Sequence, residues 1–78
     1  MQTKELFFRI VLRPEPEGGY TVIVPTLPGC ITYGETIEEA KRMAKDAIEA
    51  YLKSMEKHGE EFLDDSNTFE GVLTLKYA

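Results

Sequence analysis

The chain has 78 residues, a formal net charge of −5 and a hydrophobic fraction of 42%. This length suits one domain with one modest core, and the apolar content is typical of a folded protein. The acidity argues against a dedicated nucleic-acid binder, which would usually be basic, and favours a basic partner. One cysteine excludes an internal disulfide, and no apolar run has the length of a membrane span or the layout of a signal peptide. We expect a single cytoplasmic domain over residues 1–78 with no membrane association.

The first half of the chain predicts three strands joined by short turns. Residues 6–13 alternate between apolar and more polar positions, as a strand with one buried face does. Residues 14–19 hold two prolines, two acids and two glycines and form a turn, and a second strand is predicted at 20–24. Residues 25–29 place proline and glycine where a type II turn needs them, and 30–33 form a third, short strand. Short connections of this kind predict an antiparallel meander.

Residues 36–59 are predicted to form one amphipathic helix. Thr36 is a natural N-cap, Glu39 completes a capping box, and Gly59 can take the left-handed conformation that ends a helix. Leu52 should be buried against the sheet. The apolar residues of the stripe follow a spacing of three and four, and they are Ile37, Ala40, Met43, Ala44, Ala47, Ile48, Tyr51, Leu52 and Met55.

The chain after the helix predicts a polar, acidic loop at 60–67 and a fourth strand at 69–77. A right-handed crossover would set this strand beside the first and parallel to it. The predicted fold class is therefore α+β, with two layers in the order β-β-β-α-β. Three strands form an antiparallel meander, the fourth joins them, and one long helix covers one face. The second face of the sheet and its edges are open to a partner.

No group of side chains predicts an enzyme, a metal site or a cofactor site. The first strand has no internal acid, so the converging carboxylates of a two-metal nuclease are missing. Asp64 and Asp65 are a weak cation signal, and a solvated loop is the preferred interpretation. Cys30 is interpreted as a small buried hydrophobe rather than a reactive thiol, and His58 as a charge at the helix end. We expect no catalytic residue, no metal and no cofactor.

The middle of the chain resembles the HicB-like antitoxins. The resemblance covers roughly residues 5–60 and is specific at 20–30 (YTVIVPTLPGC) and 33–40 (YGETIEEA). In that family a strand ends in a proline, and a leucine-proline-glycine-cysteine turn follows. A glycine, an acid, a threonine cap and Glu-Glu-Ala come next. The positions that carry the motif here are Pro25, Leu27, Pro28, Gly29, Cys30, Gly34, Thr36, Glu39 and Ala40.

The resemblance implies a partial ribonuclease-H-like fold without nuclease activity. It also implies an antitoxin that neutralises a small basic ribonuclease of the HicA type by covering its active site. The candidate toxin-binding residues are three acids that could meet a basic surface and two tyrosines that could equally be core or edge residues: Glu15, Glu17, Glu35, Tyr20 and Tyr33.

Two further expectations concern partners. Self-association into a dimer or higher oligomer is expected, through the fourth strand or the open sheet face. The alternative function is a solitary homo-oligomeric module without a toxin. No segment after the helix resembles the helix-turn-helix or ribbon-helix-helix module that many family members carry. Direct DNA binding by this chain is therefore not expected.

Overall fold

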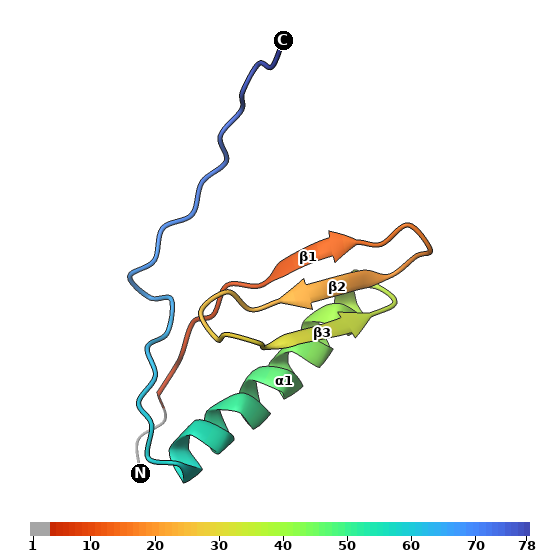
Figure 1. The fold of residues 1–78 in the computed structure, drawn as a ribbon. Helices are drawn as coiled ribbons and strands as arrows, with labels where there is room; N and C mark the ends of the chain where they lie inside the picture. The colour runs from red at the N-terminus through yellow and green to blue at the C-terminus, as the bar shows by residue number, and fades with distance from the viewer. Residues whose placement is uncertain (1–3) are drawn as a thin grey trace.

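The computed structural model describes residues 4–78, so the first three residues of the predicted domain lie outside the described part. In chain order the elements are β1 (Val11–Pro14), β2 (Tyr20–Ile23), β3 (Ile31–Gly34) and α1 (Ile37–Lys57). The strands form an antiparallel sheet in the order β1-β2-β3, and α1 crosses one face of it (Figure 1). The predicted α+β class, the meander and the single long helix are confirmed.

The first strand is shorter than predicted, because its partner ends early. Val11 pairs with Ile23, the last residue of β2. Beyond that point the amide of Val24 donates to the carbonyl of Cys30 at 3.0 Å, and Pro25 begins a turn. Residues 6–10 therefore have no ladder partner on this side, although they were predicted to be part of the strand.

The core lies between the sheet and the helix. Val22, Ala40 and Ala44 form one buried cluster. A second cluster is centred on Val24 and Leu27, and Leu52 packs against it from α1, as predicted. The half-buried hydrophobic residues around this second cluster are Phe8, Ile10, Ala47, Ile48, Tyr51, Leu52 and Met55.

The turn between β2 and β3 fixes the end of the sheet to the helix. Leu27 and Cys30 point into the core and are 2% and 5% exposed. Cys30 N donates to the carbonyl of Leu27 at 2.9 Å, and Gly29 has φ +79°, the positive value that the third residue of a type II turn needs. The hydroxyl of Tyr51 in α1 donates to the carbonyl of Pro28 at 2.8 Å. The turn and the helix are therefore held together by both apolar and polar contacts.

The start of α1 packs closely on the end of β3. A Cβ placed on Gly34 would lie 2.3 Å from the backbone nitrogen of Ala40, so only glycine fits there. The predicted cap is present: Thr36 Oγ1 accepts from Glu39 N at 3.1 Å. The carboxylate of Glu39 accepts from Glu35 N at 2.7 Å. The helix ends at Lys57, and Gly59 has φ +69°.

The predicted fourth strand at 69–77 is wrong as a strand of this sheet, since the structure assigns no strand there. After the helix the chain runs back past the beginning of β1 and then away from the sheet (Figure 1). The physical reason lies in how the segment is held. Its polar contacts with residues 7 and 9 end at Glu70, and beyond that residue the chain leads away from the β1 edge (Figure 1). The apolar side chains of the segment are exposed instead, at 96% for Phe69 and 99% for Tyr77.

Candidate interaction surface

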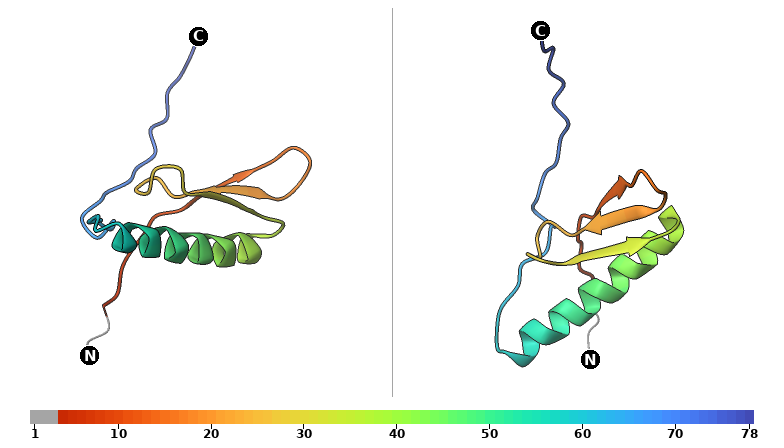
Figure 2. Two further views of the ribbon diagram at one scale, coloured as in Figure 1. Left: turned by 60° about the horizontal axis from the view of Figure 1, so that its bottom comes forward. Right: turned by 45° about the vertical axis from the view of Figure 1, so that its right-hand side comes forward.

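The face of the sheet opposite α1 carries a row of apolar side chains. Val11, Ile23 and Ile31 lie directly across from one another in the three strands. They point away from the helix, because side chains alternate along a strand and Val22 faces the core. Val11 is 47% and Ile31 is 60% exposed. Among residues 4–78 no other element lies on this face, which Figure 2 shows from two directions.

One end of the sheet is acidic and is centred on Tyr33. The Tyr33 hydroxyl donates to the carbonyl of Gly18 at 3.1 Å, in the turn between β1 and β2. Partial burial raises the pKa of Tyr33, and the charges of nearby carboxylates raise it further. In order of decreasing effect these carboxylates belong to Glu35, Glu17, Glu39 and Glu15. The structure thus gathers four of the five candidate toxin-binding residues, Glu15, Glu17, Tyr33 and Glu35, at one end of the sheet.

Glu15 differs from its neighbours because its carboxylate is already bound within the hairpin. It accepts a hydrogen bond from Thr21 Oγ1 at 2.6 Å, and Arg13 Nε lies 3.5 Å away. These contacts, the Thr21 hydrogen bond first, lower the pKa of Glu15. Glu17 and Glu35 are exposed. They are the acids of this group that a partner can reach most directly.

Tyr20 lies on the other side of the sheet. It is half-buried and packs against the cluster of Val22, Ala40 and Ala44. Of the two interpretations open from the sequence, core packing describes Tyr20, whereas Tyr33 is 43% exposed on the open face.

The acidic pair Asp64 and Asp65 is not a solvated loop, which corrects the prediction. Asp65 is 6% exposed, and its carboxylate accepts from Arg9 N at 2.7 Å and from Thr26 Oγ1. Its amide donates to the carbonyl of Phe7 at 2.6 Å, and Asp64 accepts from Phe7 N at 3.0 Å. The Arg9 amide above all, and then the Thr26 hydroxyl, hold the pKa of Asp65 below its usual value. The two carboxylates therefore accept hydrogen bonds from the backbone amides of residues 7 and 9, and they fasten the segment after the helix to the segment before β1.

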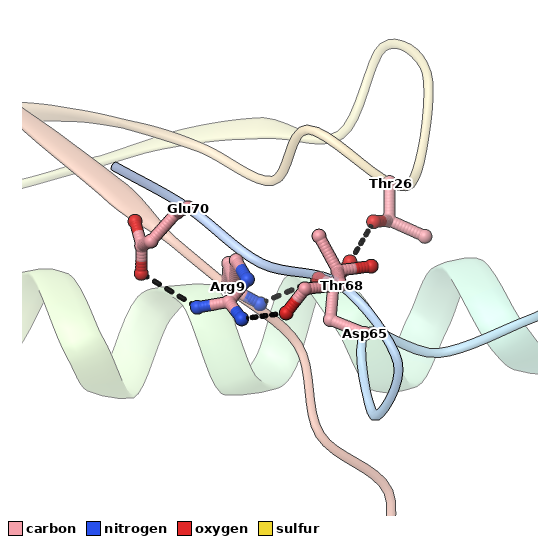
Figure 3. A network of polar contacts seen from close by, with 5 residues as sticks. All are labelled: Arg9, Thr26, Asp65, Thr68 and Glu70. Carbon is pink, nitrogen blue, oxygen red and sulfur yellow. Dashed lines mark hydrogen bonds and ion pairs between the residues drawn. The ribbon is translucent and has the colours of Figure 1, made fainter. Parts of the chain in front are cut away.

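The Arg9 side chain makes further contacts with the same C-terminal segment (Figure 3). Its Nη1 lies 2.6 Å from a carboxylate oxygen of Glu70, and Nη2 donates to the carbonyl of Thr68. Residues 64–70 are thereby fastened along residues 7–9. The sequence held one usable signal for this arrangement, a pair of acids placed after the helix, where the chain must return to the sheet.

Two other features of residues 4–78 bear on chemistry, the potential metal ligands and the cysteine thiol. Within residues 4–78, no three His, Cys, Asp or Glu side chains come together in a way that could hold a metal ion. Burial raises the pKa of the Cys30 thiol, which fits a core residue. In the same part of the chain, no helix combines the length and apolar character needed to cross a membrane.

Comparison with known proteins gives one consistent family. Residues 8–76 match the HicB-like antitoxins of bacterial toxin–antitoxin systems. A UPF0150 protein of Thermoplasma acidophilum is 41% identical over 59 residues, which cover 76% of this chain and 86% of that protein. Antitoxin HicB 1 of Photorhabdus laumondii is 41% identical over 58 residues, 69% of this chain and 37% of that antitoxin. Antitoxin HicB of Escherichia coli is 46% identical over 41 residues, 53% of this chain and 30% of that antitoxin.

A small sheet that one long helix covers on one side defines a class of two-layer α+β domains. Within that class, the chain belongs to the HicB-like antitoxin family. The structure also explains the family motif in this chain. Leu27 and Cys30 fill the core, Gly34 lets α1 approach, and Thr36 caps it. The motif therefore specifies how the helix is joined to the sheet.

Proposed function

We propose that this chain is the antitoxin of a toxin–antitoxin pair. It acts without catalysis in the cytoplasm, by binding a small basic ribonuclease of the HicA type and covering its active site. The observation that carries this proposal is the family membership. The acidic end of the sheet supports it, because a ribonuclease must offer a basic surface to the phosphates of its substrate.

The acidic end has the parts of a protein-binding hot spot. Tyr33 is an aromatic side chain held in place by its bond to Gly18, so little conformational freedom is lost when a partner covers it. Glu17 and Glu35 flank it and are free to pair with lysine or arginine. Complementary charges of this kind accelerate association and select the partner.

The test is co-expression of the chain with the small basic protein encoded beside it. The pair should co-purify, and the complex should no longer cleave RNA, whereas the partner alone should cleave it. Glu17→Lys combined with Glu35→Lys should weaken the complex by about tenfold or more and reduce its dependence on salt.

A matched control makes the same change of charge at the other end of the helix. Glu56→Lys with Glu60→Lys changes two exposed acids at the far end of the helix. At 1.5 Å per residue, this end lies about 30 Å from the helix start. That variant should bind the toxin as the parent does. If both double variants weaken binding equally, net charge rather than the Tyr33 end recognises the toxin. A chain that never co-purifies with its neighbour contradicts the proposal itself.

A further inference from the structure

Residues 72–77 have the alternating sequence pattern of an amphipathic strand but are not paired with any strand of the described chain. Leu73, Leu75 and Tyr77 fall on one side of an extended backbone, and they are 92%, 86% and 99% exposed. The other side carries Thr74 and Lys76 together with Val72. Such alternation is typical of a strand whose apolar side is buried. We call residues 72–77 the donor strand.

The beginning of this segment is fixed, and only the donor strand is free. Arg9 is bonded to Asp65, Thr68 and Glu70 (Figure 3). The amide of Phe7 donates to Asp64. Gly71 follows, and a Cβ built there would meet nothing within 4 Å. From this point the chain leaves the sheet (Figure 1). The fold therefore presents the donor strand to the outside from a defined anchor.

The same molecule also carries a surface that fits such a strand. Within residues 4–78, β1 is an edge of the sheet and its one strand partner is β2. A groove of about 500 Å³ runs between α1 and residues 4–10, the stretch that leads into β1. We call it the acceptor groove. Its apolar lining consists of Leu6, Phe8, Ile10, Ala44 and Ile48, and lysines 4, 41 and 45 with Glu49 form its rim.

We propose that two copies of this chain exchange donor strands. The donor strand of each copy pairs with the β1 edge of the other, and its Leu73, Leu75 and Tyr77 side enters that copy's acceptor groove. Each chain has one donor strand and one acceptor groove. In a two-fold dimer both grooves are therefore filled and no donor strand remains to bind a third copy. It also removes an exposed sheet edge from each copy.

The exchange would bury a substantial apolar surface. Tyr77 of two copies supplies two aromatic rings, which would bury about 300–500 Å² at 150–250 Å² each. Leu73 and Leu75 of each copy and the acceptor surfaces that they cover add to this area. The total approaches the roughly 1,200–2,000 Å² of specific interfaces. This proposal does not depend on the toxin and can be tested without it.

The first test measures the mass of the chain by sedimentation over a range of concentrations. The parent should be a dimer. Leu73→Asp with Leu75→Asp should weaken dimerisation by about 100-fold or more, because two charges would enter an apolar groove. The matched control is Leu63→Asp, which introduces a charge at another leucine that is 84% exposed, and it should dimerise like the parent.

The second test distinguishes reciprocal exchange from other dimers by complementation. Leu6→Asp damages the acceptor groove and leaves the donor strand intact, whereas the Leu73→Asp and Leu75→Asp variant does the reverse. Each variant alone should be a monomer. A mixture of the two should form heterodimers held by one intact junction. A far-UV spectrum like that of the parent shows that each variant has folded.

Three results of the association experiments would overturn the proposal, and a fourth comes from hydrogen exchange. The first three are a parent chain that stays monomeric at the highest concentrations, a dimer that the donor-strand charges leave unchanged, and folded variants whose mixture does not associate. A monomer whose amides at 72–77 resist hydrogen exchange would also overturn it, because the strand would then have paired with its own chain.

Discussion

The body of the molecule, residues 11–57, and the C-terminal segment, residues 60–78, use similar side chains in opposite ways. Leu27 is 2% exposed, whereas Leu73 is 92% exposed. In the body, the strands, the turn at 25–29 and the helix cover one another. In the segment, only the part up to Glu70 is held, and polar groups hold it. An alternating apolar pattern thus predicts a strand with one buried face. It does not show whether the same chain or another chain covers that face.

The largest difference should appear when a leucine is shortened in each region. Leu27→Ala removes a buried side chain from the cluster around Val24 and should cost about 2–5 kcal/mol of unfolding free energy. Leu63 lies in the C-terminal segment and is 84% exposed, so Leu63→Ala should change the unfolding free energy by less than about 0.5 kcal/mol. Urea unfolding at one fixed protein concentration measures both. Equal effects would mean that the segment shares the core.

The two regions should also differ in their tolerance of an added methyl group on glycine. Gly34→Ala would push a Cβ to within 2.3 Å of the Ala40 backbone and should cost about 1–3 kcal/mol through overpacking. Gly71→Ala meets nothing within 4 Å and should leave thermal unfolding almost unchanged. A Gly34→Ala protein that melts like the parent would contradict the close contact between β3 and α1.

The junction between the regions should depend on Asp65. Asp65→Ala leaves the Arg9 amide and the Thr26 hydroxyl without their acceptor and should cost about 1–3 kcal/mol. It should also release the segment, so that limited proteolysis cuts after the helix much faster while the body stays intact. The exposed Asp46→Ala is the control, and its cleavage pattern should match that of the parent.

The smallest expected effect is a weakening, at low pH, of the contacts that Asp64 and Asp65 make with residues 7 and 9. The pKa of Asp65 is lower in the folded chain than its usual value of 3.8, and the pKa of Asp64 is lowered as well. The stability that they contribute is therefore fully present above about pH 4 and is lost as the pH falls through the folded values. Proteolysis of the parent should accelerate below pH 4, whereas the Asp65→Ala chain should respond less. An equal response of both chains would exclude Asp65 as the cause.

The sequence was sufficient for the body because the signals there are local. The cap at Thr36, the glycine after the helix and the turn at 25–29 each act within a few residues, and all three are in place. Glu15 and Glu17 lie in the turn between β1 and β2, and Glu35 follows β3. The structure brings these three acids close to Tyr33.

What the sequence could not give depends on contacts between distant residues. Asp65 is separated from Arg9 by 56 positions, and no local pattern distinguishes a solvated acid from one that caps a backbone amide. Tyr20 and Tyr33 could not be told apart until the register showed which face each occupies. The prediction of a fourth strand in this sheet was wrong because the polar contacts that hold the segment end at Glu70, and no local pattern shows where the chain goes after that residue.

Hydrogen exchange at two protein concentrations tests the central comparison most directly. The amides of β2 and α1 should be protected in both samples, since one chain alone completes their bonds. The amides of residues 72–77 should exchange freely in the dilute sample and become protected in the concentrated one. Protection of 72–77 that does not change with concentration, or that never appears, would contradict the account.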